Sequence, residues 1–290
     1  MQIPYYPDFT PLTLEERDEM QPRLSQLPDG VSEYTFANLF LFRRQYQYRV
    51  SRVLDKTFII SGEEKGEKFF MTPCAVPDRD VLEALFKTHD YWKGLPDSVL
   101  IPNRERLEEW GIAIAEDRDN FDYLYLRKEL ADLAGKKYHK KRNLVNQFVN
   151  YYAHEQRPLT PELIPQAVWV LDRWREDKGF DGDYVAARES LEWFAALDLR
   201  GAMYYINGEP AGWCLGESLA ERRMFVIHFE KAIDEYKGIF QYINQSFAAS
   251  LPESFLHINR EQDLGDEGLR QAKLTYRPSG FVRKYTGRTV

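Results

Sequence analysis

Side chains that can accept a proton or stabilise an anion are concentrated in the stretch Phe255–Tyr285. Two acids, Glu261 and Asp263, follow a short apolar run, and a glycine break separates them from cationic and phenolic groups. The other polar candidates of this stretch are Asn259, Lys273, Tyr276 and Arg277. Transfer of an acyl group to an amine or hydroxyl requires a proton acceptor and a donor that stabilises the developing oxyanion. Either acid could accept the proton or bind a substrate ammonium, and the groups after the glycine could hold a phosphate, a carboxylate or the oxyanion.

The same side chains also fit a buried polar network that locks the end of a strand to the last helix. The segment Asp263-Leu264-Gly265 looks structural, which leaves Glu261 and Lys273 as the preferred catalytic pair. These two residues lie twelve positions apart, with Gly265 between them. The chain can therefore fold back and place both side chains in one cleft. We expect Glu261 to handle an acceptor amine or hydroxyl, and Lys273 to neutralise a donor phosphate or the oxyanion.

A second candidate is the turn Tyr236-Lys237-Gly238, which is expected between a strand and a long helix. A turn whose N–H groups point at an anion, with the helix dipole behind it, can hold the pyrophosphate of an acyl donor. Gly238 permits close approach of the anion, and Lys237 adds positive charge. However, Phe240 stands where such a loop usually has a small residue. If the turn is functional, Tyr236-Lys237-Gly238 is expected on the wall of the cleft that holds Glu261 and Lys273. The other interpretation is an ordinary strand-to-helix turn with a glycine.

The third candidate is a basic cluster, with six basic or potentially basic side chains in seven residues. Its members are Lys136, Lys137, His139, Lys140, Lys141 and Arg142. A cluster of this kind suits a phosphate backbone such as the acceptor arm of tRNA, or an anionic lipid surface. We expect it to face a cleft between two units of the fold. The alternative is a solvated connector between those units.

Composition and charge exclude several classes of protein. The chain has 290 residues, of which 43% are hydrophobic and 14% aromatic, so a packed core is expected. Its net charge of −7 makes it a poor general binder of nucleic acid, so any RNA contact needs a local basic patch. Two distant cysteines, Cys74 and Cys214, predict neither a disulfide framework nor a metal site, and they fit a cytoplasmic location. No signal peptide and no transmembrane segment is expected.

The predicted elements occur twice in the same order, as helix, three antiparallel strands, helix and strand. The strands expected in the first half are Tyr48–Leu54, Thr57–Ser61, Lys68–Thr72, Val99–Ile101 and Phe121–Leu126, with turns at Lys56 and Gly62–Glu67. Those in the second half are Ala202–Ile206, Ala211–Glu217, Arg223–Phe229 and Phe255–Ile258. The main helices are expected at Tyr34–Tyr46, Asp80–His89, Arg104–Trp110, Arg127–Leu133, Pro161–Trp174, Tyr184–Leu197, Ile239–Ser250 and Gly268–Leu274. This order predicts two tandem α/β units, residues 1–135 and 136–290.

A short echo in the sequence supports an internal duplication. Leu100-Ile101-Pro102-Asn103-Arg104-Glu105 resembles Leu256-His257-Ile258-Asn259-Arg260-Glu261, and both segments follow a predicted long helix. We therefore expect Asn103 and Asn259 to lie at equivalent strand ends. His228, in the third strand of the second unit, is interpreted as a hydrogen-bonded core residue, because a histidine in an apolar strand seldom acts as a catalyst.

Several segments resemble an uncharacterised bacterial family related to the C-terminal catalytic domain of phosphatidylglycerol lysyltransferases. The matching segments are Asn259–Gly265, Gly268–Leu274, Tyr276-Arg277-Pro278, Lys284-Tyr285, Gly135–Asn143, Ser32-Glu33-Tyr34 and Asn38-Leu39-Phe40. The resemblance implies two acetyltransferase-like units, each a mixed and mostly antiparallel sheet flanked by helices. It also implies aminoacyl transfer from aminoacyl-tRNA to an amine or hydroxyl on a lipid or another small molecule, without a metal.

Two other functions stay open at this point. The chain could be an N-acyltransferase that uses acyl-coenzyme A, for which the turn Tyr236-Lys237-Gly238 would hold the pyrophosphate. It could also bind a ligand or partner without turnover, because one fold hosts many functions. The departures of this turn from a phosphate-binding loop favour the aminoacyl reaction over the coenzyme A reaction.

Overall fold

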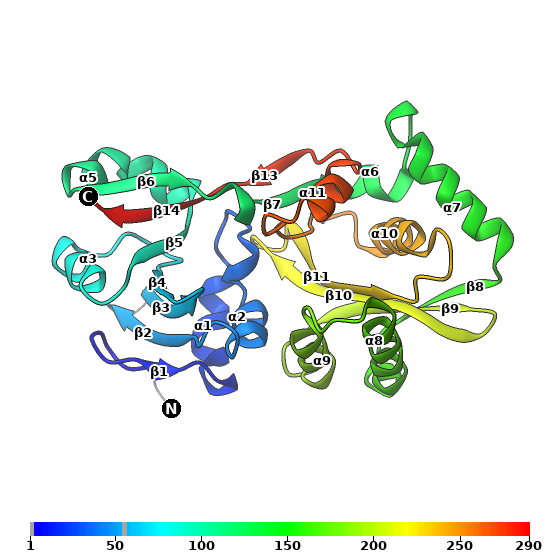
Figure 1. The fold of residues 1–290 in the computed structure, drawn as a ribbon, viewed down its shortest axis with the longest axis horizontal. Helices are drawn as coiled ribbons and strands as arrows, with labels where there is room; N and C mark the ends of the chain where they lie inside the picture. Colours follow the sequence, from blue (N-terminus) through cyan, green and yellow to red (C-terminus); the bar gives the residue numbers. More distant parts are fainter. Residues whose placement is uncertain (1–2, 54–56) are drawn as a thin grey trace.

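A computed structural model describes residues 3–53 and 57–290. The described residues form two mixed sheets of seven strands each, with helices on both faces (Figure 1). The strand order is β1-β2-β3-β4-β5-β14-β6 in the first sheet and β13-β7-β12-β11-β10-β9-β8 in the second. The two units lie side by side along the longest axis of the molecule (Figure 1).

The first half of the chain contributes most of the first sheet. Its strands are β1 (Thr10–Pro11), β2 (Arg49–Val53), β3 (Thr57–Glu64), β4 (Glu67–Met71), β5 (Tyr91–Pro96), β6 (Ile112–Glu116) and β7 (Asp122–Leu126). Its helices are α1 (Arg17–Leu24), α2 (Phe36–Phe42), α3 (Arg79–Phe86), α4 (Asp97–Leu100), α5 (Arg104–Glu109) and α6 (Arg127–Asp132).

The second half contributes most of the second sheet. Its strands are β8 (His154–Pro158), β9 (Arg200–Ile206), β10 (Glu209–Leu219), β11 (Met224–Ala232), β12 (His257–Asn259), β13 (Gly280–Val282) and β14 (Lys284–Thr289). Its helices are α7 (His139–Tyr151), α8 (Ile164–Lys178), α9 (Tyr184–Glu192), α10 (Ile239–Ser250) and α11 (Glu267–Leu274).

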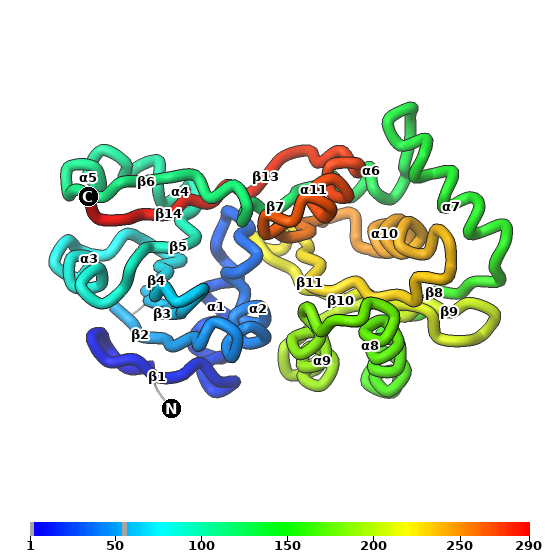
Figure 2. The backbone as a smooth tube through the Cα atoms, viewed as in Figure 1, coloured from blue at the N-terminus to red at the C-terminus, as the bar shows by residue number. Residues whose placement is uncertain are grey.

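The two sheets share one pattern of pairing. Each has a parallel pair at its centre, β4 with β5 in the first sheet and β11 with β12 in the second. In each sheet the parallel pair is followed by an antiparallel strand that comes from the other half of the chain. β14 pairs with β5 and β6, and β7 pairs with β12 and β13. The units therefore exchange one strand each, and the red β14 lies among the strands of the first unit in Figure 2.

This exchange affects the expected domain boundary and the expected duplication. The common pairing pattern agrees with two related units. A division at Gly135, however, does not separate two complete sheets, because β7 precedes it and β14 belongs to the first sheet. The sequence echo was misplaced: Leu100 ends α4, whereas Leu256 precedes β12.

The strand predicted at Val99–Ile101 is also wrong, because these residues are helical. Short apolar runs fit a buried helix as well as a strand. Here Val99 and Leu100 pack as helical residues in the core under α3 and α5, and the preceding strand is β5. The other strands predicted within the described residues are present with shifted ends, whereas the turn expected at Lys56 lies outside the described residues.

The largest hydrophobic core runs through both units. It joins residues of α2 and the inner face of the first sheet to residues of α8, α9 and one face of the second sheet. A second core lies between the other face of the second sheet and α10, and a third lies between the outer face of the first sheet and α3. The junction of the units is therefore a packed interior in which buried polar groups need partners.

An ion pair joins the first residues of the two exchanged strands. The Lys284 ammonium of β14 donates to Asp122 Oδ1 of β7 at 2.7 Å, and both side chains are fully buried. Lys284 also pairs with Glu33, and Ser32 donates to the same Asp122 carboxylate from its backbone N–H and its hydroxyl. Burial lowers the pKa of the Lys284 ammonium, but the two carboxylates outweigh it and raise that pKa overall.

Removal of the Lys284 ammonium should strongly destabilise the protein. Lys284→Met leaves the Asp122 and Glu33 carboxylates without their cation in a buried position, which typically costs about 3–5 kcal/mol. Urea unfolding curves measure this loss, and Lys87→Met on the exposed surface is the control, with an expected change below about 0.5 kcal/mol. Equal stability of the two variants would contradict a structural role for the pair.

Candidate functional site

Glu261 follows β12 in a strained backbone conformation. Its φ of 55° lies in the left-handed region, which non-glycine residues seldom adopt. The turn is held by Asn259, whose Oδ1 accepts the Glu261 N–H at 2.7 Å. The Asn259 amide in turn donates to the Gly30 carbonyl and to Asp122 Oδ2. Asn259 is therefore a support for Glu261, although it was expected to contact substrate.

A β-bulge in β11 points His228 toward Glu261. The ladder pairs Leu215 with Phe229 and Gly216 with Ile227, which leaves His228 as an extra residue. As a result, Ile227 packs on the α10 side of the sheet, while Phe229 packs in the core between the units. A Cβ on Gly216 would lie 1.7 Å from the Val226 carbonyl oxygen, so the strand opposite the bulge requires glycine here.

His228 lies between two carboxylates in the junction. Its Nδ1 is 2.8 Å from Glu261 Oε1, and its Nε2 is 3.1 Å from Glu217 Oε1 on the neighbouring strand. Burial lowers the pKa of His228, but hydrogen bonds to Glu217 and Glu261 outweigh it and raise the pKa to about 9. At neutral pH the ring is therefore an imidazolium that donates to both carboxylates. Asn38 of α2 adds a further hydrogen bond to Glu261 Oε1, at 3.3 Å.

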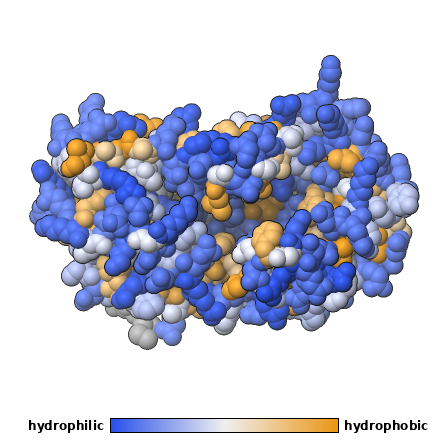
Figure 3. All heavy atoms as spheres, viewed as in Figure 1, coloured by the Kyte–Doolittle hydropathy of each residue, from blue (hydrophilic) through white to orange (hydrophobic). Residues whose placement is uncertain are grey.

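Glu261 is the member of this cluster that a ligand can reach. Its side chain is 17% exposed, compared with 1% for His228 and 5% for Glu217. Oε1 accepts both hydrogen bonds, and Oε2 has no hydrogen-bond partner among residues 3–53 and 57–290. Figure 3 shows the surface hollowed near the middle of the molecule. A fixed carboxylate with one unoccupied oxygen can accept a proton or bind an ammonium.

Lys273 has a different position from the one expected. Its ammonium donates to the carbonyls of Arg260, Glu261 and Gln262, so α11 holds the loop that carries Glu261. Burial, together with the charge of Arg260, lowers the pKa of Lys273 to about 8. All three donors of the ammonium are occupied by the protein. This arrangement does not support the expected binding of a phosphate or oxyanion by Lys273.

Asp263 is also a structural residue in this arrangement. Its fully buried carboxylate accepts from Arg118, Arg270, the Tyr123 hydroxyl and the Gly265 N–H. Burial raises the pKa of this carboxyl, but these donors outweigh burial and hold the pKa well below its usual range. A carboxylate that is saturated with donors is a poor proton acceptor, so the geometry does not support Asp263 as a base.

Tyr276 lies on the other face of the second sheet from Glu261. It packs in the core beside α10, and the Lys141 ammonium lies 4.0 Å from the centre of its ring. The Arg260 guanidinium is also close to that ring and pairs with Glu230 at 3.0 Å. Tyr276 thus packs between α7 and the end of α11.

The turn Tyr236-Lys237-Gly238 is covered by α7 on one side. A Cβ on Gly238, whose φ is 92°, would lie 2.7 Å from the Leu144 carbonyl oxygen. Tyr152 packs edge-on against Tyr236, with ring centres 5.5 Å apart. The glycine therefore allows close contact between α10 and α7. This packing explains why position 238 is a glycine without a bound pyrophosphate.

The basic cluster divides into paired and unpaired side chains. Lys137 pairs with Glu129, and Arg142 donates to carbonyls at the end of α6. Lys136 and Lys140 are exposed and have no ion-pair partner among the described residues. Arg277 is exposed and lies near Tyr138: burial and Glu129 raise the pKa of Tyr138, and the charge of Arg277 opposes that rise, so Arg277 extends the cluster. The cluster lies at the start of α7, away from the first unit (Figure 1), so the expected position in a cleft between the units is wrong.

Three residues of the site were not selected from the sequence. His228 was assigned to the core, and Glu217 and Asn38 were given no role in catalysis. His228 and Glu217 are polar positions in two predicted apolar strands, and Asn38 lies in a segment that carried the family resemblance. Their partnership depends on the bulge in β11 and on the contact between the units, which no local sequence pattern contains.

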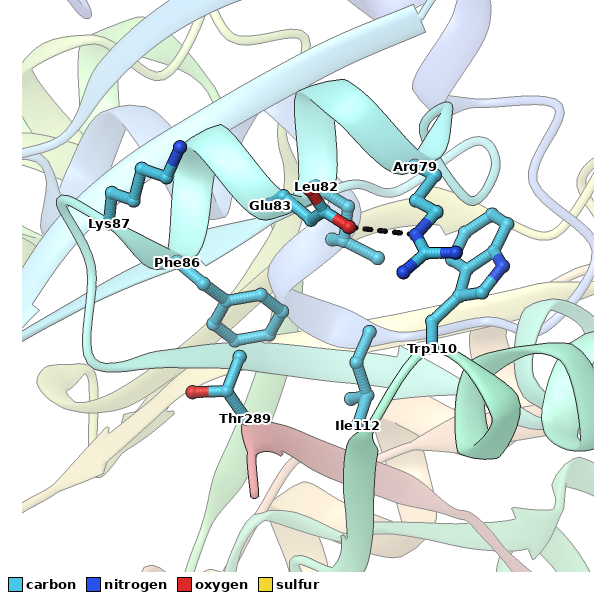
Figure 4. A pocket seen from close by; sticks show the side chains of 8 residues that line it. All are labelled: Arg79, Leu82, Glu83, Phe86, Lys87, Trp110, Ile112 and Thr289. Atoms are coloured by element: carbon cyan, nitrogen blue, oxygen red, sulfur yellow. Dashed lines mark hydrogen bonds and ion pairs between the residues drawn. The ribbon is translucent and has the colours of Figure 1, made fainter.

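Four cavities among the described residues lie away from Glu261. One of about 310 Å³ lies between α3 and β6, where Leu82, Phe86 and Ile112 form an apolar wall beside the Arg79–Glu83 pair (Figure 4). Among residues 3–53 and 57–290, no group of three or more His, Cys, Asp or Glu side chains is arranged so that it could hold a metal ion. The same residues contain no helix that is long and apolar enough to span a bilayer.

The charge on His228 should make stability depend on pH. The folded-state pKa of about 9 exceeds the unfolded value of 6.5, so the contribution is complete below pH 6.5 and is lost as pH rises through 9. A difference of this size corresponds to about 3 kcal/mol. We expect the stability difference between the protein and His228→Asn to shrink across this range in urea titrations. Lys273 titrates with the opposite sign, and the subtraction removes its contribution. A difference that is independent of pH would contradict a buried imidazolium.

Comparisons with known proteins identify the family. A family model for the C-terminal region of phosphatidylglycerol lysyltransferase matches residues 24–287. A conserved protein of unknown function from Bacteroides thetaiotaomicron is 31% identical, with a TM-score of 0.88 over 97% of this chain and 99% of that chain. The structure of L-PGS from Bacillus licheniformis is 15% identical, with a TM-score of 0.61 over 100% of this chain and 94% of that chain.

A further relative is an uncharacterised protein of Mycoplasmoides gallisepticum, which is 24% identical over 187 residues. That match covers 61% of this chain and 58% of the relative, so it spans less than two thirds of either protein. The structural likeness to L-PGS, with the shared pairing pattern of the two sheets, confirms the expected tandem acetyltransferase-like fold. The chain belongs to the family of the C-terminal domain of phosphatidylglycerol lysyltransferases.

Proposed function

We propose that the protein transfers an aminoacyl group from aminoacyl-tRNA to an amine or hydroxyl of a lipid or another small molecule. The observation that carries this proposal is the Glu261 carboxylate, which is held through one oxygen and open through the other. The proposed reaction class comes from the family, because the family model describes the C-terminal region of phosphatidylglycerol lysyltransferase. The reaction needs no activation of the donor, because an aminoacyl ester is already reactive toward an amine or hydroxyl.

Glu261 is the proposed proton acceptor of this reaction. The acceptor oxygen or nitrogen attacks the ester carbonyl, and its proton passes to Glu261 Oε2. The bond between the carbonyl carbon and the ribose oxygen of the tRNA then breaks, and that oxygen takes the proton from Glu261, which restores the carboxylate. His228 and Asn38 act as positioning residues, because they fix Oε1 and leave the orientation of Oε2 defined. Ordering the reacting groups in this way contributes to rate without further chemistry from the protein.

The exposed cations at the start of α7 are the proposed contact for the tRNA phosphates. Lys136, Lys140 and Arg277 are free to bind an external anion, whereas the turn Tyr236-Lys237-Gly238 packs against α7. This difference favours a polynucleotide donor over acyl-coenzyme A. Lys273 of α11 donates to the backbone carbonyl of Glu261, and Arg277 follows the same helix. A phosphate bound at Arg277 would therefore be connected through α11 to the loop that carries the Glu261 carboxylate.

Loss of the Glu261 carboxylate should abolish most of the transfer. Glu261→Gln keeps the shape of the side chain but removes its capacity to take a proton, for which a loss of about 10²–10³-fold in turnover is typical. The assay mixes the protein with ¹⁴C-aminoacyl-tRNAs and a bacterial lipid and metabolite extract, and measures label in non-tRNA products.

Glu105→Gln on the exposed surface of α5 is the matched control for this assay and should retain full transfer. If Glu261 is a structural residue, its replacement lowers the melting temperature while the folded fraction still transfers label at the normal rate. That result, or normal transfer by a fully stable Glu261→Gln protein, would contradict the proposed base.

Charge reversal at Lys140 should weaken tRNA binding. Each lost phosphate contact lowers affinity and reduces the slope of log Kd against log salt by about 1. Filter binding of unacylated tRNA to Lys140→Glu, at several salt concentrations, measures both quantities. Lys87→Glu in the first unit should bind as the unmodified protein does. Equal binding by both variants would show that the cluster is a solvated surface.

A further inference from the structure

A large cavity lies in the first unit, on the opposite face of the sheet from the junction. It has a volume of about 780 Å³ and is bounded by residues of three segments. These are the loop Tyr6–Phe9, strands β2 to β4, and Thr88–His89 after α3. It contains a serine and a histidine in direct contact, and neither residue takes part in the proposed aminoacyl transfer.

The hydrogen bonds of His89 define its tautomer. Nδ1 lies 3.0 Å from the Leu85 carbonyl oxygen, which can only accept, so Nδ1 carries a proton. Nε2 lies 2.8 Å from Ser61 Oγ. Burial and the charge of Lys68 lower the pKa of His89, while the Leu85 carbonyl and the charge of Asp90 act in the opposite direction. In the neutral ring, Nε2 has a lone pair and accepts the Ser61 hydroxyl proton. The Thr88 hydroxyl, 2.9 Å from Nδ1, further fixes the ring.

Strand pairing brings cations beside this hydroxyl. Arg49 lies directly opposite Ser61 in the ladder, so both side chains share one face of the sheet. The Arg49 guanidinium is anchored by a bond to the Phe9 carbonyl at 2.6 Å, which leaves other N–H groups for a ligand. Lys68 of β4 also lines the cavity and has no ion-pair partner among residues 3–53 and 57–290; the acids Asp8 and Glu63 lie in the same lining.

We propose that Ser61 is a nucleophile, with His89 as its general base, for small carboxylic esters that carry an anionic group. Ser61 Oγ attacks the ester carbonyl while its proton moves to His89 Nε2. The bond to the leaving alkoxide breaks, and the alkoxide takes that proton and departs as an alcohol. Water hydrolyses the acyl-serine by the same proton transfers in reverse order. Arg49 faces the oxyanion, and Lys68 binds the anionic group of the substrate.

A fluorophosphonate probe tests this nucleophile directly. The full-length protein should gain one adduct by intact mass, and peptide mapping should locate it on Ser61. Ser61→Ala should gain none, whereas Ser279→Ala, a control at an exposed serine, should label as the unmodified protein does. His89→Gln should slow labelling by about 10²-fold or more, because it removes the base. Hydrolysis of p-nitrophenyl acetate should follow the same order.

The unmodified protein decides the outcome even if a variant fails to fold. Absence of an adduct on Ser61 in the folded protein would overturn the proposal and leave the hydrogen bond as a tie between β3 and the end of α3. An adduct that persists in Ser61→Ala would also overturn it. Labelling should fall as pH drops below 6.5 and His89 becomes protonated, and a rate independent of pH would exclude His89 as the base. Loss of aminoacyl transfer in Glu261→Gln has no bearing on these results.

Discussion

The buried contact between Lys284 and Asp122 is the interaction on which the arrangement of the molecule depends. It ties the first residues of the two exchanged strands, so each sheet is complete only when the other is in place. The same Asp122 carboxylate accepts from Ser32 and Asn259, and Asn259 holds the backbone of Glu261. A continuous series of hydrogen bonds therefore runs from the strand exchange to the carboxylate with the open oxygen. Lys284, Asp122, Ser32 and Asn259 are buried. Loss of any one of these side chains therefore leaves a buried neighbour without its hydrogen-bond partner.

The electrostatics of the junction suit a cationic group, such as an ammonium, beside Glu261. Glu217, His228 and Glu261 together carry one net negative charge when the ring is an imidazolium. The imidazolium ring lies between the two acids and offsets the repulsion between them. Glu261 is the most exposed of the three side chains and therefore presents most of this negative charge to solvent. The first unit contributes Asn38 to this group, so the site belongs to both units.

The sequence predicted the fold class and the stretch that holds the site better than it predicted the roles of individual residues. Glu261 could be selected because it follows a predicted buried strand, where open α/β sheets usually place their sites, and because it lies in a segment with a family resemblance. Asp263 and Lys273 have equally suitable side chains, yet their partners are Arg118 and Arg270 in one case and three backbone carbonyls in the other. Those contacts depend on the path by which α11 folds back onto the loop that carries Glu261. The types of the individual residues do not predict this path. The exchange of β7 and β14 could not be predicted either, because both strands satisfy the same local pattern in either sheet.

The exchange of strands also governs the order in which the protein can be completed during synthesis. β5 and β6 leave the ribosome early, but the strand that joins them is formed by residues 284–289. Until those residues emerge, the first sheet has a gap at which two strands present unpaired N–H and C=O groups. The first sheet, most of whose strands are translated first, is therefore completed only after β14, the last strand of the second half, has been synthesised. Cells would have to shield this open sheet throughout translation, and a chain that stops before residue 284 would keep both edges exposed to aggregation.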